Sequence, residues 1–411
     1  MAIEKQNPLQ DILPEELTEQ VQEPVEVVLP ESMDIDGQMA PAFELGANGQ
    51  MIPLFDEEEV IVPEHQVNLA EVLDSSSLNT LANELLDAYE QDKDSRKDWL
   101  DVFTKGLDLL GIKIEEREQP FPGATGVNHP LLSEAVTQFQ AQAYKELLPA
   151  GGPVKTRVMG NESPEVMAQS QRVKEFMNYQ ITDVMKEYDP EMDSLLFYLP
   201  LAGSAFKKVY YDNLLGRATS RLVKAEDLVV AYETTDLETS PRFTHVMSMT
   251  GNDLKKLQLA GSYRQTDIGE ATDLDYNEAK EKMDELQGIA KPITDYDEYT
   301  VLELHVDLEL EDDNNYGFAV PYVVTILEDT SEILSIRRNW NENDELFRKK
   351  EYFVHYKFLP GLGFYGFGLI HMIGGLTKSA TSILRQLVDA GTLSNLPAGF
   401  KARGMRVQGE D

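Results

Sequence analysis

Three glycines, Gly361, Gly363 and Gly366, have the Gly-x-Gly-x-x-Gly spacing of a dinucleotide-binding loop. They follow a strand-like stretch, Tyr352–Phe358, and precede a helical pattern. Glycines at such positions let a backbone approach a pyrophosphate at a helix N-terminus. A dinucleotide site also needs an acidic residue at the end of a second strand, and the candidate, Asp389, falls inside the helical pattern. The pattern therefore favours a close-packed hinge, and no cofactor is expected.

Patterns typical of metal sites and nucleophilic catalysis are weak in this sequence. No two of the six histidines stand four apart on a helix, and no H-E-x-x-H occurs. Glu278 and Lys280 resemble the Glu-x-Lys end of a metal-dependent nuclease site, but such a site needs an aspartate on a neighbouring strand. The run Asp312–Asn315 carries oxygen ligands suited to Ca²⁺, although it is also typical of a turn. Neither a Walker loop nor G-x-S-x-G is present, so no catalytic or metal-binding residue is predicted.

A long helix is predicted after the glycines, from Leu369 to Ala390, with Gly391 as its end. Its apolar stripe comprises Leu369, Ile373, Leu376, Ala380, Ile383, Leu387 and Ala390. A second, polar stripe comprises Lys378, Ser382, Arg385 and Asp389. By itself the polar stripe is typical of a solvated helix face.

The twenty residues from Phe358 to Thr377 contain no Asp, Glu, Lys or Arg, and a run of that length can span a bilayer. Its glycines and Pro360 leave little continuous apolar surface and interrupt a helix. We therefore divide the run into a Gly-rich elbow, residues 360–368, and the start of the long helix. No membrane partner is expected.

Length and charge limit the functional classes. A chain of 411 residues is long enough for two or three domains. Its net charge of −37 disfavours tight binding to DNA by neutralisation of phosphates. The absence of cysteine excludes disulfides and thiolate metal sites and fits a reducing cytoplasm. The first ten residues lack the basic and then apolar pattern of a signal peptide.

The first part of the chain is predicted to be a flexible acidic tail followed by helices. The first sixty residues hold fifteen acidic residues and one basic residue, Lys5, so the tail is predicted over residues 1–65. Helical periodicity covers residues 68–110 and 131–148, and a further helix begins at Ser163. The predicted inward face of that helix comprises Val166, Ser170, Val173, Met177, Ile181, Val184 and Tyr188.

Strands become more frequent in the second half of the chain. Short strands are predicted at 205–211, 221–230 and 243–249, and short helices at 252–259 and 277–286. From Thr300 to Glu311 apolar and polar residues alternate, which predicts a half-buried strand. With further strand-like runs at 319–327, 333–340 and 352–358, this region is predicted to form an antiparallel meander. The predicted fold class is α+β.

Two long stretches resemble the portal proteins of short-tailed double-stranded DNA bacteriophages. They are FPGATGVNHPLLSEAVTQFQAQAYKELLPAGGPVKTRVMG, residues 121–160, and YFVHYKFLPGLGFYGFGLIHMIGGLTKSATSILRQLVDAGTLSNLPAGFKARGMRV, residues 352–407. A portal-like order of elements extends from about residue 70 to the end. The resemblance implies a structural, non-enzymatic subunit of a ring at one capsid vertex, a dodecamer in this family, through which DNA is packaged and ejected.

The resemblance also implies a division of the chain. It implies a wing at residues 66–250, a first stem region at 251–298, a β-rich clip at 299–358, and the elbow with a second stem helix at 359–396. Residues 397–411 would begin a returning wing strand, and we expect the protein to continue beyond residue 411. The joint between clip and stem would comprise Gly361, Gly363, Gly366 and Gly368.

Partners and contact surfaces follow from the same resemblance. The implied partners are copies of the chain itself, the major capsid and scaffolding proteins, the terminase large subunit, a tail adaptor and, weakly and without sequence preference, viral duplex DNA. The protein would assemble in the host bacterial cytoplasm and end in the virion. Lys378, Ser382 and Arg385 would face the channel. The clip surface that meets partners would carry Arg337, Arg338, Arg348, Lys349 and Lys350. The alternative that remains open is a phage DNA-processing enzyme, a metal-dependent nuclease with an acidic site.

Overall fold

The described strands of this chain pair only in antiparallel fashion. The computed structural model describes residues 43–45, 51–53, 64–112, 117, 121, 123–160, 162–212, 215–269, 278–288, 298–310 and 317–395. The chain divides into residues 1–62 and 63–411. In the first unit β1 (Phe43–Leu45) pairs with β2 (Met51–Pro53). Almost all of the predicted acidic tail otherwise lies outside the described residues, as do Asp312–Asn315 and residues 397–411.

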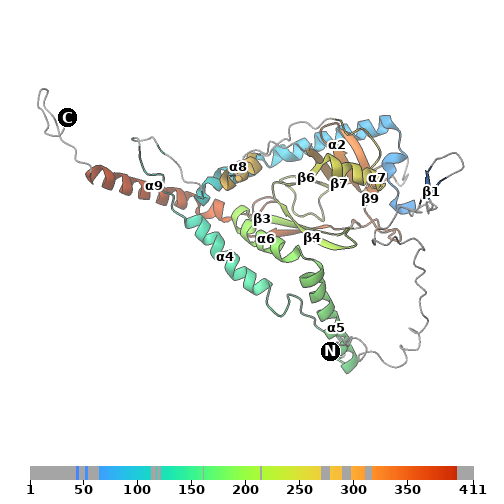
Figure 1. Cartoon of the computed structure of the whole chain (residues 1–411), viewed down its shortest axis with the longest axis horizontal. Helices are drawn as coiled ribbons and strands as arrows, with labels where there is room; N and C mark the ends of the chain where they lie inside the picture. The colour runs from blue at the N-terminus through green and yellow to red at the C-terminus, as the bar shows by residue number, and fades with distance from the viewer. Residues whose placement is uncertain are drawn as a thin grey trace, which may run out of the picture. The chain divides into compact units, whose positions relative to one another are not determined.

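The second unit combines helices with two antiparallel sheets, so the fold is α+β, as the sequence predicted (Figure 1). Its longer helices are α2 (Ser75–Ser95), α3 (Lys97–Leu107), α4 (Leu131–Leu147), α5 (Pro164–Tyr179), α6 (Tyr188–Ala202), α7 (Gly251–Leu259), α8 (Glu278–Gln287) and α9 (Leu369–Asn395). Its strands are β3 (Ser204–Asp212), β4 (Arg217–Lys224), β5 (Leu228–Val229), β6 (Arg242–Thr250), β7 (Glu298–Leu308), β8 (Val320–Leu327), β9 (Glu332–Arg338) and β10 (Phe353–Lys357).

The larger sheet has the strand order β5-β6-β7-β8-β9, and the smaller sheet has the order β10-β3-β4. Helix α2 lies beside the larger sheet, as Figure 1 shows. Asp74 begins this helix, since its carboxylate accepts hydrogen bonds from the backbone N–H groups of Ser76 and Ser77. Leu78 and Leu85 then share a core with the sheet.

The prediction that Tyr352–Phe358 extends the meander is wrong. β10 pairs instead with β3, where Phe353 lies opposite Lys208. The predicted clip, residues 299–358, therefore shares both sheets with strands from the predicted wing. Phe353 is buried against Phe243 of β6, and their ring centroids are 5.5 Å apart. Such a contact between distant segments cannot be deduced from local alternation of residues.

Strand β7 is buried on both faces rather than on one. Leu302 and Leu304 face the core that contains α2. On the opposite face Glu303 contacts Lys208 of β3, and His305 packs against Phe353 of β10. The predicted half-buried strand is therefore wrong in one respect, because alternation shows that two faces differ in polarity but not that the polar face meets water.

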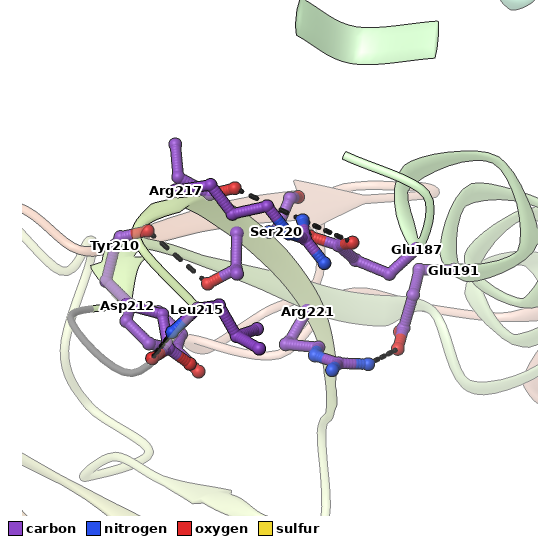
Figure 2. A network of polar contacts seen from close by, with 10 residues as sticks. Glu187, Glu191, Tyr210, Asp212, Leu215, Arg217, Ser220 and Arg221 are labelled. Atoms are coloured by element: carbon purple, nitrogen blue, oxygen red, sulfur yellow. Dashed lines mark hydrogen bonds and ion pairs between the residues drawn. The ribbon is translucent and has the colours of Figure 1, made fainter. Parts of the chain in front are cut away.

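Two carboxylates at the start of α6 satisfy the open edge of the smaller sheet, and Figure 2 shows the first of them, Glu187, which precedes the helix. Glu187 accepts a hydrogen bond from the backbone N–H of Ser220 at 3.4 Å, and Glu191 accepts one from Leu222 at 2.7 Å. Residues four apart on a helix and two apart on a strand are both separated by about 6–7 Å, so the two acceptors match the two donors. Figure 2 also shows Arg217 paired with Glu187. Because these N–H groups are already hydrogen-bonded, a further strand cannot pair with this part of the β4 edge.

An asparagine side chain likewise forms hydrogen bonds with the free edge of β9. The Asn68 amide donates to the carbonyl oxygen of Leu334 at 3.1 Å and accepts from the N–H of Ile336 at 2.9 Å. It pairs with the strand as another backbone would. The segment that precedes α2 is thus joined to the far edge of the larger sheet.

Helix predictions are mostly confirmed in position but not always in orientation. Gly111 ends the first helical region with a left-handed φ of 67°, and Ser163 caps α5, both as predicted. α5 has no buried residue, so its predicted inward face is wrong. α9 continues past Gly391 to Asn395, because a single glycine weakens a helix without ending it. Among the described residues, no helix combines the length and apolarity required to cross a bilayer.

A buried guanidinium joins three segments of the second unit. Arg96, between α2 and α3, is almost fully buried. It donates to the carbonyl oxygens of Ala225 and Glu226 at 2.6 Å each and to that of Leu228 at 3.0 Å. It also donates to the hydroxyl of Tyr365 in the elbow at 3.0 Å.

We expect Arg96→Met to destabilise the fold by about 3–5 kcal/mol, because it leaves buried oxygen acceptors without their donor. Urea unfolding followed by circular dichroism would measure the loss. The matched control is Lys97→Met at the exposed neighbouring position, which should change stability by less than about 0.5 kcal/mol. Equal stability of the two variants would contradict the structural role assigned to Arg96.

Candidate functional site

The elbow is held against the rest of the chain by direct backbone contact. A Cβ atom on Gly366 would lie 2.4 Å from the carbonyl oxygen of Gly203, and one on Gly368 would lie 2.2 Å from that of Leu201. Gly361 and Gly363 are equally confined, by Tyr365 and Tyr232. The predicted close packing of these glycines is confirmed, and their spacing is explained without a bound phosphate.

The two large side chains of the elbow are buried in the central core. Phe364 stacks on Phe206 and on His355, and Tyr365 stacks on Trp99. The Tyr365 hydroxyl donates to the Leu228 carbonyl at 2.9 Å and accepts from Arg96. The elbow therefore fixes the position from which α9 starts.

Leu369 and Ile373, at the start of the apolar stripe of α9, pack against the central core, whereas later members of the stripe face solvent. The exposed fractions of Leu376, Ile383 and Leu387 are 62%, 66% and 70%. The buried residues of the helix are instead Ile370, Gly374, Thr377 and Asp389. The sequence identified the two stripes but not which of them the rest of the chain covers.

Asp389 and Arg385 of the polar stripe of α9, together with Thr381, are bound to the loop that precedes α4. Asp389 accepts a hydrogen bond from the N–H of Thr125 at 2.8 Å, and Thr381 accepts one from the N–H of His129 at 3.0 Å. Arg385 donates to the carbonyl oxygen of Val127 at 2.9 Å. This contact brings residues 121–160 and 352–407, the two stretches that carry the resemblance, against each other.

The three predicted channel residues line one groove between α3, the loop before α4, and α9. Its volume is about 1130 Å³, and Lys378, Ser382 and Arg385 all border it. Lys105 and Arg117 add positive charge, and Arg117 lies 3.8 Å from Asp389. Lys378 and Ser382 are exposed, whereas Arg385 is half-buried in its contact with the loop. The structure thus brings the three together but uses Arg385 internally.

Two members of the predicted basic surface of the clip, Arg337 and Lys349, form hydrogen bonds within the fold. Arg337 donates to the carbonyl oxygens of Gln66 and Ser262, both at 3.0 Å. Lys349 is half-buried, donates to the Leu237 carbonyl at 2.8 Å, and its pKa is lowered by burial. Of the remaining members, Arg338 and Lys350 are half-buried and Arg348 is exposed. Charge reversal at Arg337 would therefore disturb the fold as well as any docking surface.

A polar cluster between the two sheets was not predicted from the sequence. The Lys208 ammonium lies 2.7 Å from both carboxylate oxygens of Glu303, and the His305 Nε2 lies 3.0 Å from one of them. His245 is opposite Glu303 in the pairing of β6 with β7. The sequence indicated only that Glu303 and His305 lie on the same face of a strand. It did not indicate that β3 and β6 pack against that face.

The environment of this cluster shifts its pKa values. Burial by itself raises the pKa of Glu303, but the hydrogen bond with His305 and the charge of Lys208 hold that pKa well below its ordinary value. Burial, with the charge of Lys208 nearby, lowers the pKa of His245 to about 3. Near neutral pH the cluster therefore contains an ionised Glu303 and an uncharged His245.

We expect His245 to make the fold sensitive to acid. In the unfolded chain this histidine titrates near 6.5, so between that pH and about 3 the unfolded state binds a proton that the folded state excludes. The stability is present above pH 6.5 and is lost on acidification, by about 2 kcal/mol between pH 6.5 and 5. Urea unfolding of wild type and His245→Gln across this range would measure the difference. Parallel curves for the two proteins would contradict the assignment.

The residues of the nuclease alternative border a second cavity, of about 360 Å³. Glu278 and Lys280 of α8 line it together with Glu226 and Asp227, which precede β5. Burial, with Asp227 adjacent, raises the pKa of Glu226 to about 7, and the Tyr198 hydroxyl donates to its carboxyl group. Within the part of the chain that the structure describes, no group of three or more His, Asp or Glu side chains is arranged to hold a metal ion.

No protein-family model matches this sequence, and it has no significant match among curated proteins. Function must therefore be inferred from the residues and geometry of this chain.

Proposed function

We propose that this protein is a portal-type structural subunit of a short-tailed double-stranded DNA phage. Identical copies would form a closed ring at one capsid vertex, with the α9 helices side by side around a channel for packaging and ejection of DNA. The ring would contact the major capsid and scaffolding proteins, and it would be the docking platform for the terminase large subunit and then for a tail adaptor. The protein itself would catalyse no reaction.

The observation that carries this proposal is the exposed apolar stripe of α9. Leu376, Ile383 and Leu387 fall on one face of the helix, and a contiguous apolar face on a single chain is typical of a contact site. Burial of one such side chain stabilises an assembly by about 1.5–3 kcal/mol before the cost of association. Repetition of the same contact around a closed ring would cover the stripe in every copy.

The resemblance supports the same proposal from the sequence. Its two stretches are separated by about two hundred residues, yet the loop before α4 and the polar stripe of α9 bind each other directly. Each stretch therefore includes a segment that contacts the other, which supports a common origin for the two similarities. The lumen side of α9 would be marked by Lys378 and Ser382, which this contact leaves exposed.

We expect the wild-type protein to form rings, and an Ile383→Ser, Leu387→Ser double variant to lose them. Each substitution removes apolar surface that is exposed in one chain, so stability of the subunit should be nearly unchanged while assembly weakens by at least about tenfold. Native mass spectrometry and electron microscopy would report the assembly. The matched control is Ser379→Ala with Thr392→Ala, two hydroxyls of α9 that bond their own helix. A wild type that remains monomeric at high concentration would contradict the ring.

We expect duplex DNA to bind weakly and without sequence preference, at about 10⁻⁴ M near physiological salt. The reason is electrostatic, since a chain of net charge −37 repels a polyanion. Fluorescence anisotropy at several low salt concentrations would measure the affinity. Lys378→Ala should reduce the slope of log K against log salt by about 0.9 for each phosphate that the variant fails to neutralise. The control is Lys255→Ala on α7, which should leave the slope unchanged.

An affinity of about 1 µM or tighter, or a preference for one sequence, would contradict a weakly binding channel. Mg²⁺-dependent cleavage of the same DNA would favour the nuclease alternative instead. Substitution of Glu278 by Gln would then be expected to abolish that cleavage.

A further inference from the structure

We propose that a second subunit contact is made by the α5 arm, defined as the extended segment 154–160 together with helix α5. The arm would pack against a second copy of this chain, through apolar side chains and through positive charges that make the contact sensitive to salt. The proposal rests on the ring proposed above and adds to it a contact surface separate from α9.

The two parts of the arm, the extended segment and α5, form hydrogen bonds with each other. The Asn178 side chain accepts from the N–H of Val154 at 2.9 Å and donates to its carbonyl oxygen at 3.2 Å. The Thr156 hydroxyl donates to the carbonyl oxygen of Ser170 at 3.2 Å. These bonds fix the extended segment along one side of α5, and no residue of that helix is buried.

The other sides of α5 present apolar residues to solvent. Phe176 is 61% exposed, and Val173 and Met177 are exposed on the same side of the helix, whereas Met167 is exposed at the groove with the extended segment. Met159, in the extended segment, is 92% exposed. An isolated helix of this length is marginally stable in water and normally gains its stability by packing an apolar face. The arm therefore has the surface of a packed helix without a partner among the described residues of its own chain.

Positive charge accompanies the apolar residues. Lys155, Arg157 and Lys174 line a groove of about 930 Å³ between the extended segment and α5. The arm, as defined, contains four basic and two acidic side chains, a local excess of two positive charges in a chain of net charge −37. The arm is thus a basic and apolar surface on a strongly acidic molecule.

A second copy of the same chain satisfies both properties. Each copy offers acidic surface to the basic groove, and each offers exposed apolar side chains such as Tyr211 on β3. Nucleic acid would satisfy the charges but leaves Met159 and Phe176 unexplained. Because ionic attraction is screened over about 8–10 Å at ordinary salt, the contact should weaken as salt increases.

The absence of cysteine allows a direct test on the full chain. Met159→Cys introduces one thiol at the tip of the arm, and its rate of reaction with a maleimide reports whether that tip is covered. We expect labelling to slow by at least about tenfold when the protein assembles, because a covered thiol reacts only during opening of the contact. The control is Leu259→Cys on α7, at a position that is 82% exposed, which should react at the same rate in both states.

A charge-reversal pair tests the electrostatic part. Lys155→Glu with Arg157→Glu should weaken assembly by at least about tenfold at about 50 mM salt, and the defect should shrink at about 500 mM salt. The matched control is Lys145→Glu with Lys255→Glu, which changes net charge equally at exposed positions outside the arm. Sedimentation velocity would measure assembly, and circular dichroism would verify that each variant folds.

The outcomes separate this proposal from the ring itself. Rings in the wild type, with slowed labelling and a defect in the arm variant alone, support both. Rings with unchanged labelling at Met159→Cys and with equal assembly of the two charge variants overturn the arm contact and retain the ring; the arm would then belong to a different protein. A wild type that never assembles overturns both.

Discussion

The buried guanidinium of Arg96 is the interaction on which the arrangement of the second unit depends. It donates to the backbone carbonyl groups of Ala225 and Glu226, in the loop between β4 and β5, and to that of Leu228, the first residue of β5. Through the Tyr365 hydroxyl it also holds the elbow. A buried cation is costly unless most of its donors are used, so the contacts of Arg96 with these segments stabilise one another.

The position of α9 follows from that constraint. Tyr365 and Phe364 anchor the elbow in the central core, and Gly366 and Gly368 bring its backbone against Gly203. The helix that follows can then present only certain residues to the loop before α4. Asp389 and Thr381 take that side, which leaves Leu376, Ile383 and Leu387 of the apolar stripe exposed.

Exposed apolar surface and large net charge have opposite effects on the association of copies of this protein. A charge of −37 keeps separate copies apart at long range, whereas apolar contacts act only after close approach. Salt at physiological strength screens the repulsion beyond about 8 Å. Assembly is therefore expected to depend on local surfaces where the acidic excess is relieved, and the arm formed by residues 154–160 and α5 is such a surface.

Local sequence patterns predicted the elements better than their partners. The glycine spacing located the elbow, the alternation from Thr300 located β7, and Ser163 located the start of α5. Each of these signals depends on residues close together in the chain, such as a cap or a side-chain period. The α+β class follows from the elements alone.

Most of the errors concern which side chains and strands contact each other. Arg96 binds a loop about 130 positions away, and Lys208 pairs with Glu303 across 95 positions. Neither contact can be deduced from the neighbouring residues in the sequence, because Arg96 and Lys208 both resemble ordinary surface residues there. The apolar face of α5 was assigned to the core for the same reason. A period reveals that a helix has an apolar face but not whether its own chain or another molecule covers it.

That distinction changes which residues of α9 are available to a channel. Arg385 has the charge to contact a phosphate, yet its guanidinium already donates to the carbonyl oxygen of Val127. To reach DNA it would have to give up a hydrogen bond that helps to hold α9 on the loop before α4. Lys378 and Ser382 lie about two turns and one turn nearer the elbow, respectively, and remain exposed. A lumen lined by these two residues would present one cation and one hydroxyl per copy. Such a surface would contact a phosphate backbone but would not bind it tightly.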